Sequence, residues 1–234
     1  MRPISIGVIL SGCGHLDGSE IHEAVLVLLA LAREGVAAHL YAPDTALVEV
    51  DHVTGAPTGR ERSVLREAAR IARGKVADLA QAKGTDHDGW ILPGGFGAAK
   101  NLSDFAAKGA TGSVNREVNR VLREALAARL PVGACCIAPA VLALIGKASS
   151  TKLRLTLGRD RELAKVLQSM GHTHVDAGAG DVVIDADRKV VTTPAYMLDA
   201  AIHEIQPGIE AMVHQVVVWS RDELSAPRYA PARS

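Results

Sequence analysis

The chain has 234 residues, with 26 lysine plus arginine residues against 26 aspartate plus glutamate residues, so its formal net charge is zero. This balance argues against a protein that binds nucleic acid or an anionic membrane, and we expect a small-molecule partner instead. The longest apolar run, 24–32, is too short to cross a bilayer, and the amino terminus resembles neither a signal peptide nor a transit segment. The three cysteines, an odd number with two adjacent, predict free thiols and a cytoplasmic location.

Apolar strands alternate with amphipathic helices along the chain. The expected elements are strand 4–10, helix 19–34, strand 37–42, a polar stretch through residue 60, helix 61–73, strand 89–92, helix 114–128, strand 132–135, a hairpin of 181–185 with 189–193, and helix 208–224. This order predicts one α/β domain over residues 1–224: a doubly wound, mostly parallel sheet with helices on both faces and a hairpin near the carboxyl terminus. Residues 225–234 are expected to form a flexible tail.

The strand that ends at Cys135 is followed at once by Cys136, at a junction between strand and helix. A side chain at such a junction lies beside unpaired helix N–H groups, whose dipole favours a thiolate by up to about 2 kcal/mol, or about 1.5 pKa units. We therefore predict Cys136 as a nucleophile with a lowered pKa. Alternation turns Cys135 into the core. The alternative is that both cysteines are small core residues.

Small residues follow the expected strands at 12–14 and 94–95, so they and Cys136 should converge at the carboxyl ends of a parallel sheet, where ligands bind. The amides of the turn at Gly94 and Gly95 are predicted oxyanion donors, opposite the amide of Ile137. A tight turn without a catalytic role is the alternative. The pair Gly12-x-Gly14 lacks the third glycine and the acidic residue of a dinucleotide site, so no cofactor is expected.

Two acids at the start of the first helix are candidates for proton transfer. Glu23 shares a face with Leu26 and Val27, where apolar neighbours should raise its pKa and suit it to a proton shuttle beside a thiol. Glu20 lies in the first turn, where acids commonly compensate the helix dipole. A solvated acid at the helix flank is the alternative for Glu23.

Histidines are scattered along the chain. His15 and His22 lie near the predicted site and, with Cys13, are candidates to line it. The pairs Cys13-x-His15 and His172-x-His174 each supply only two ligands, so no metal site is expected. No histidine follows Cys136, where Ile137 stands, which argues against the amide hydrolysis of glutamine amidotransferases.

Five segments closely resemble the ElbB family, a branch of the class I glutamine amidotransferase-like group that includes PfpI-type proteases and parkinsonism-associated deglycases. They are GVILSGCG (7–14), DGSEIHEA (17–24), PGGFGAAKNL (93–102), CIAPA (136–140) and TTPAYM (192–197). The resemblance spans nearly the whole chain and implies a flavodoxin-like fold, usually a homodimer, with glutathione-independent glyoxalase activity, no cofactor and a loose association with isoprenoid biosynthesis.

The resemblance also implies roles for single residues. Cys136 matches the family nucleophile, and Glu23 matches the acid that contacts it. Gly94 and Gly95 match the oxyanion turn, and Asn101 in the same segment is a further candidate to line the site. Many relatives carry a histidine shortly after the next strand, whereas segment 155–158 of this chain has none.

The predicted chemistry is attack of the Cys136 thiolate on an aldehyde carbon of glyoxal or a related dicarbonyl, giving a 2-hydroxy acid such as glycolate. A different class of function uses the same thiol: a redox-sensing or binding protein in which Cys136 is oxidised without turnover. Amide hydrolysis is the third possibility.

Overall fold

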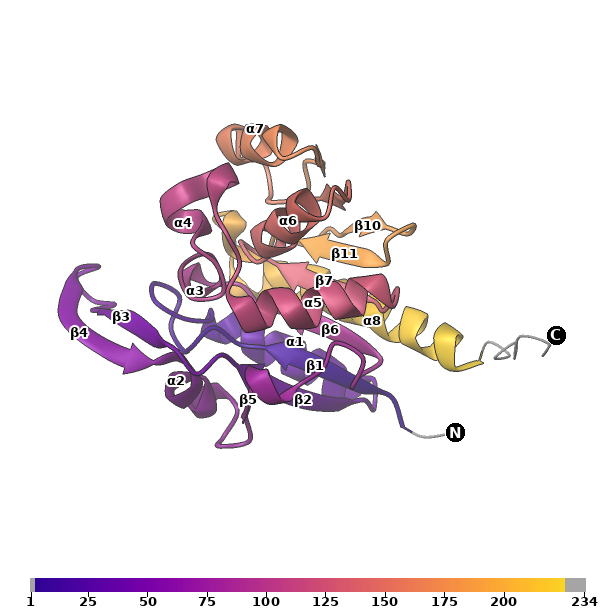
Figure 1. Cartoon of the computed structure of the whole chain (residues 1–234), viewed down its shortest axis with the longest axis horizontal. Helices are drawn as coiled ribbons and strands as arrows, with labels where there is room; N and C mark the ends of the chain where they lie inside the picture. The colour runs from indigo at the N-terminus through magenta and orange to yellow at the C-terminus, as the bar shows by residue number, and fades with distance from the viewer. Residues whose placement is uncertain (1–2, 226–234) are drawn as a thin grey trace.

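The computed structural model describes residues 3–225, which are built around a seven-stranded sheet (Figure 1). Its strands are β1 (Ser5–Ile9), β2 (Ala37–Ala42), β5 (Ala77–Asp78), β6 (Gly89–Leu92), β7 (Val132–Cys135), β10 (Val183–Asp185) and β11 (Val190–Thr193). They lie in the order β10-β11-β7-β6-β1-β2-β5, and all neighbours are parallel except β10 with β11. The sheet is therefore the mostly parallel, flavodoxin-like sheet predicted from the alternation of strands and helices.

Helices cover both faces of this sheet. The longer ones are α1 (Ile21–Arg33), α2 (Val64–Ile71), α5 (Arg116–Ala127), α6 (Pro139–Ala148), α7 (Arg161–Ser169) and α8 (Ile202–Ser225). Helices α1 and α8 pack together on one face, and α5 lies beside α6 on the other (Figure 1). Every residue of β6 and β7 is buried, as expected for central strands covered on both sides. Within residues 3–225, no helix is both long and apolar enough to cross a membrane.

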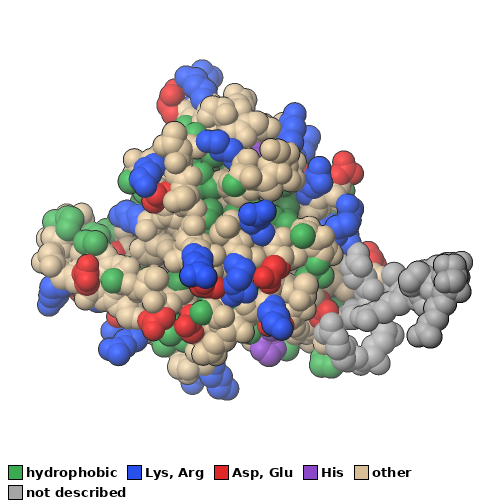
Figure 2. All heavy atoms as spheres, viewed as in Figure 1, with side chains coloured by type: hydrophobic (Ala, Val, Ile, Leu, Met, Phe, Trp, Pro, Cys, Tyr) green, Lys and Arg blue, Asp and Glu red, His purple; other side chains and the backbone are tan. Residues whose placement is uncertain are grey.

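Short elements complete the chain and lie mainly beyond the strand ends. They are α3 (Phe96–Lys100), α4 (Phe105–Lys108), β8 (Arg154–Leu155), β9 (Thr173–His174) and the 3-10 turns η1 (Leu79–Gln81), η2 (Gly109–Thr111) and η3 (Ala195–Met197). Figure 1 shows α4 and α7 together above the carboxyl ends of the central strands. Acidic and basic side chains are interspersed over the face seen in Figure 2.

One part of the prediction is wrong: an antiparallel hairpin, β3 (Ala46–Val50) with β4 (Pro57–Ser63), replaces the polar stretch and the start of helix 61–73. Only Leu47 in these two strands is buried, so the hairpin has no apolar alternation to reveal it. The helix starts later because the Ser63 hydroxyl accepts a hydrogen bond from the Arg66 N–H at 3.2 Å and caps α2.

The last helix is longer than predicted. It begins at Ile202 rather than Gly208 and continues through Pro207. A proline near the start of a helix removes a single amide donor, and the helix packs against the sheet on both sides of it. Ser225 is the last helical residue, and the rest of the predicted tail, 226–234, lies outside the described residues.

The sheet topology positions three loops around one crevice. The chain moves from β1 outward to β2 but from β6 in the opposite direction to β7, so the winding reverses between the adjacent strands β1 and β6. Ligands bind at such switch points, beyond the carboxyl ends of the strands. The predicted hairpin of β10 and β11 is confirmed, and β11 pairs with β7 so that Thr193 lies opposite Cys135.

Candidate active site

Cys136 occupies a sharp turn between β7 and α6, as predicted. Its backbone φ is 58°, a left-handed conformation that is uncommon for a non-glycine residue and costs about 1–3 kcal/mol. The Cys136 N–H donates to the Thr193 carbonyl at 3.0 Å, which holds the turn against β11. The amides of Gly95 and Ile137 form hydrogen bonds to the thiol sulfur.

Glu23 lies directly beside this thiol with no exposed surface, in the first turn of α1. Its Oε2 accepts a hydrogen bond from the Gly94 N–H at 3.1 Å, and Oε1 accepts one from the Tyr196 N–H at 3.2 Å. The carboxylate also forms a hydrogen bond with the Cys136 thiol. Burial, reinforced by the negative charge of Glu20, raises the pKa of Glu23 to about 7, although the hydrogen bonds oppose this shift.

The expected lowering of the Cys136 pKa is wrong. Burial raises the pKa of this thiol well above its ordinary value, and the nearby charge of Glu23 raises it further. The amides of Gly95 and Ile137 act in the opposite direction but do not compensate. The sulfur is therefore a protonated thiol at rest, and its proton has an acceptor at hand in the Glu23 carboxylate.

Cys135 is fully buried at the end of β7, as predicted, but it is not separate from the site. Its Sγ donates to Oε2 of Glu23 at 3.8 Å, and burial together with the Glu23 charge raises its pKa. Two adjacent thiols thus contact one carboxylate, and only Cys136 lies on a cavity.

The two glycines after β6 have different tasks. Gly94 gives its N–H to Glu23, so the prediction that this amide is an oxyanion donor is wrong. Gly95 has a φ of 95°, and a Cβ there would lie 2.3 Å from the Glu20 nitrogen. The amides of Gly95 and Ile137 both contact the Cys136 sulfur, so they are the pair suited to hold an oxyanion formed there.

A cavity of about 770 Å³ opens beside the Cys136 thiol. The predicted residues His15 and His22 line it, and the His22 Nδ1 lies 2.9 Å from the Tyr196 hydroxyl. Tyr196 is a site residue that sequence reasoning did not single out, although it lies within the TTPAYM segment. The full lining is His15, Glu20, His22, Gly95, Phe96, Ala99, Phe105, Ala106, Gly109, Cys136, Ile137, Leu163, Val166, Tyr196 and Met197.

Two predicted lining residues lie elsewhere. The half-buried Cys13 is not part of the cavity, and the charges that act on its thiol include those of Glu67 and Arg70 at α2. The Asn101 side chain donates to the carbonyls of Ser11 and Asp17, each at 2.8 Å. Asn101 therefore fixes the loop after β1 instead of facing a ligand, because its two amide hydrogens are used inside the fold.

The β3–β4 hairpin supports the same loop. Arg62 lies 2.5 Å from the Asp17 carboxylate, which also accepts the Val50 N–H at 2.9 Å. His52 makes an edge contact with His15, with ring centroids 5.1 Å apart. The unpredicted hairpin thus positions one wall of the cavity.

No group of three or more histidine, cysteine or acidic side chains within residues 3–225 is arranged to hold a metal ion. In the pair His172-x-His174, the His172 Nε2 donates to the Ala143 carbonyl at 2.8 Å. The His174 Nε2 accepts the Leu157 N–H at 3.2 Å. Both rings therefore serve the backbone.

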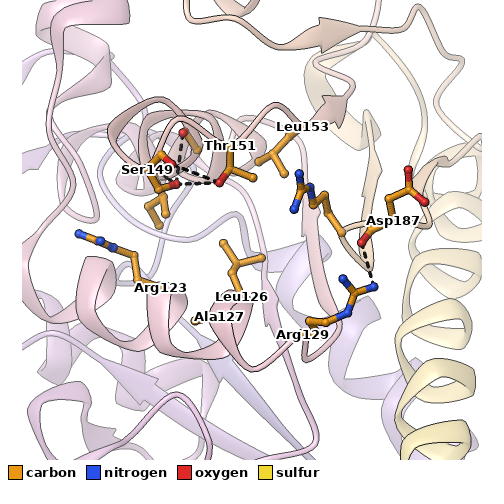
Figure 3. A pocket seen from close by; sticks show the side chains of 11 residues that line it. Arg123, Leu126, Ala127, Arg129, Ser149, Thr151, Leu153 and Asp187 are labelled. Carbon is orange, nitrogen blue, oxygen red and sulfur yellow. Dashed lines mark hydrogen bonds between the residues drawn. The ribbon is translucent and has the colours of Figure 1, made fainter.

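A second cavity, of about 340 Å³, lies at the amino ends of β7 and β11 (Figure 3). Its lining includes Arg123 and Arg129 from the α5 side and Asp187 from the hairpin turn. The Arg129 guanidinium donates to the Asp187 carbonyl oxygen at 3.2 Å. No cysteine, histidine or glutamate lines this cavity, so the chemistry-bearing residues gather at Cys136.

Comparison with known proteins agrees with this geometry. No protein-family model matches the chain. It is 44% identical over 228 residues to the human mitochondrial glutamine amidotransferase-like class 1 domain-containing protein 3, covering 92% of this chain and 84% of that protein. It is also similar to the crystal structure of an isoprenoid biosynthesis protein with an amidotransferase-like domain from Ehrlichia chaffeensis. That structure has a TM-score of 0.87 and 36% identity, with 92% of this chain and 99% of the other covered.

A more distant structure, glyoxalase III from Candida albicans, shares the fold alone. It has a TM-score of 0.60 and 12% identity, with 92% of this chain and 97% of the other covered. The human relative and the Ehrlichia structure are similar over almost their whole lengths. The chain therefore belongs to the glutamine amidotransferase-like class 1 domain family, in the ElbB branch that its motifs resemble.

Proposed function

We propose that the chain is a cofactor-independent glyoxalase that converts small 1,2-dicarbonyls, such as glyoxal, to 2-hydroxy acids, such as glycolate. The observation that carries this proposal is the hydrogen bond between the buried Glu23, with a pKa of about 7, and the thiol of Cys136. A general base works best when its pKa is near the working pH, and a buried thiol needs such a base. The fold shared with glyoxalase III of Candida albicans is consistent with the proposal.

The first step forms a carbon–sulfur bond. The Cys136 sulfur adds to one aldehyde carbon while its proton passes to Glu23, and the carbonyl oxygen becomes an alkoxide between the amides of Gly95 and Ile137. Return of the proton from Glu23 to this oxygen gives a neutral thiohemiacetal. The neighbouring carbonyl points toward the polar side of the cavity, where His22 and the Tyr196 hydroxyl lie.

The second step moves hydrogen within the substrate. Glu23 removes the proton from the carbon bonded to sulfur, which gives an enediol, and returns a proton to the adjacent carbon. The product is a thioester of a 2-hydroxy acid, so one carbon is oxidised and the other reduced without an external redox partner. Water then adds to the thioester carbon, the carbon–sulfur bond breaks and the Cys136 thiol is restored.

The alternative of a redox sensor is less well supported. Oxidation to sulfenic acid begins from a thiolate, and a sensor cysteine is typically exposed with a lowered pKa. Here the thiol is 8% exposed, and burial beside Glu23 raises its pKa. An enzyme requires the thiolate only at the moment of attack, when Glu23 accepts the proton.

The test is an assay of the purified full chain with glyoxal and methylglyoxal. Saturable consumption with one glycolate or lactate formed per dicarbonyl supports the proposal, and loss of turnover in Cys136→Ala assigns the nucleophile. Stoichiometric modification of Cys136 without product would overturn it in favour of a sensor or binding protein.

Two further expectations remain proposals. We propose a homodimer, for which the supporting observation is an apolar stripe on α1: Ile21, Val25 and Leu29 are 45%, 49% and 40% exposed and lie one helical turn apart. We also propose a cytoplasmic location from the free cysteines, although the human relative is named as mitochondrial.

A further inference from the structure

The cavity beside Cys136 is much larger than glyoxal. Its volume of about 770 Å³ lies within the range of roughly 300–1,000 Å³ typical of sites for drug-sized ligands. Glyoxal has four non-hydrogen atoms and would leave most of this volume to water. A site that selected glyoxal alone would have no use for the additional space.

The polar and apolar residues of the cavity are separated. His15, Glu20, His22 and Tyr196 gather near the thiol. Beyond them the lining is apolar and comes from α3, α4, α7 and the η3 turn: Phe96, Ala99, Phe105, Ala106, Leu163, Val166 and Met197. A ligand that satisfies both parts has a carbonyl group at one end and hydrocarbon at the other.

Helices α4 and α7 supply the far wall, and both keep their charged residues away from it. Lys108 pairs with Asp104 at 2.7 Å, and Lys165 pairs with Glu162 at 2.7 Å. None of these four residues lines the cavity, whereas Phe105 of α4 and the i, i+3 pair Leu163 and Val166 of α7 do. Figure 1 shows the two helices adjacent above the strand ends. The far wall therefore offers no partner for a phosphate, a carboxylate or an ammonium group.

We propose that the preferred substrate is a 2-oxoaldehyde with an uncharged alkyl tail of about four to eight carbons, whose dicarbonyl end meets Cys136 and whose tail lies against α4 and α7. This inference rests on the proposed glyoxalase function and adds the substrate class. Each methylene buried on the apolar wall should contribute a factor of about four, the equivalent of about 0.8 kcal/mol. Glyoxal and methylglyoxal are then minimal substrates that leave the wall unused.

The first experiment measures kcat/KM for unbranched 2-oxoaldehydes from methylglyoxal to 2-oxononanal, each corrected for its intrinsic reactivity with a free thiol. We expect 2-oxoheptanal, with four more methylene groups than methylglyoxal, to be better by roughly 100-fold. The gain should appear mainly in KM. A flat or falling series with measurable methylglyoxal turnover would overturn the inference and leave the glyoxalase function standing.

Variants test the position of the tail. Val166→Asp introduces a charge into the wall and Val166→Trp fills the space, so each should reduce the ratio of kcat/KM for 2-oxoheptanal over methylglyoxal at least tenfold. Gln168→Asp, an exposed change on the same helix and outside the cavity, is the matched control and should preserve the ratio. Equal ratios in all four proteins would place the tail elsewhere and overturn the inference.

A binding series separates this inference from the proposed function. Isothermal titration of unreactive 2-alkanones into the Cys136→Ala protein needs no turnover, and heptan-2-one should bind at least tenfold more tightly than butanone. If no 2-oxoaldehyde is consumed but this preference holds, the glyoxalase function fails while the apolar tail site stands. If neither ketone shows a preference, the tail site is wrong.

Discussion

Gly94 and Glu23 fit together without space for even a methyl group between them. A Cβ on Gly94 would lie 2.5 Å from the Glu23 Oε2 and 2.3 Å from the Cys136 Cβ, while the Gly94 N–H donates to the same carboxylate oxygen at 3.1 Å. Contacts this short force a shift of the reacting groups. The bare backbone at this position therefore allows thiol and carboxylate to meet.

Gly94→Ala should reduce kcat/KM by at least roughly 100-fold, because a misplacement of about 1 Å in a catalytic pair has this effect. The overpacking should also lower the free energy of unfolding by about 1–3 kcal/mol. Kinetics and urea unfolding measure the two effects. Gly180→Ala is the control, since its Cβ would meet nothing closer than 3.3 Å. Near-normal turnover in Gly94→Ala would contradict the tight geometry of the site.

Replacing each cysteine should give three different results. Cys136→Ala should abolish dicarbonyl turnover, because only this thiol lies on the cavity. Cys135→Ala should retain turnover within a few-fold yet lose about 1 kcal/mol of stability, since its fully buried sulfur leaves a small void. Cys13→Ala should change neither. A dead Cys135→Ala protein that is still folded by circular dichroism would move the nucleophile to Cys135.

Glu23→Gln should lower turnover by roughly 100-fold or more, the usual scale of general acid–base catalysis, because an amide cannot accept the thiol proton. Glu20→Gln keeps an oxygen that can cap α1 and should remain within a few-fold of wild type. Steady-state kinetics at pH 8 decide between them. If Glu20→Gln were the inactive variant, the proton shuttle would be Glu20.

The activity of the wild type should rise with pH and level off above about 7. Glu23 must be ionised to accept the proton, and its pKa is raised to about 7 by burial and by the charge of Glu20. Removing that charge in Glu20→Gln should move the midpoint of kcat/KM to lower pH, with little change in the plateau. A profile that instead falls through pH 7 would show that the protonated carboxyl is the active form.

The same carboxyl group should make stability depend on pH. Its pKa is about 7 in the folded protein and about 4.5 when unfolded, so the folded state binds more protons between these values. The contribution of Glu23 is therefore most favourable below about pH 4.5 and is lost as the pH rises through 7. Between pH 5 and pH 8 it should lower the free energy of unfolding by on the order of 2 kcal/mol. Urea unfolding of wild type and Glu23→Gln at both pH values isolates this term, since only the wild type should show it.

Val25→Lys should dissociate the proposed homodimer, because a charge would replace the centre of the apolar stripe on α1. Val53→Lys is the matched control, since Val53 is 95% exposed in the loop between β3 and β4, away from α1. Sedimentation velocity at several concentrations measures the result. A wild type that stays monomeric at all concentrations would refute the dimer.

Much of the fold follows from local pattern. The buried strands at 5–9, 89–92 and 132–135 are continuous apolar runs, and the hairpin of 183–185 with 190–193 has clear strands and a polar turn. Cys136 was recognisable because a strand, a turn and a helix succeed one another within a few residues. Glu23 was recognisable from its place on an apolar helix face. These signals lie within short stretches of chain, where propensity and periodicity act directly.

Tertiary structure decided the rest. The pKa of Cys136 is raised because long-range packing buries the sulfur beside Glu23, a factor the helix dipole alone does not include. Tyr196 reaches Glu23 only because β11 pairs with β7, and the apolar wall of the cavity exists only because α4 and α7 fold over the strand ends. The sequence by itself determined which residues carry the chemistry, whereas desolvation and contacts between distant segments determined their protonation and the shape of the space they face.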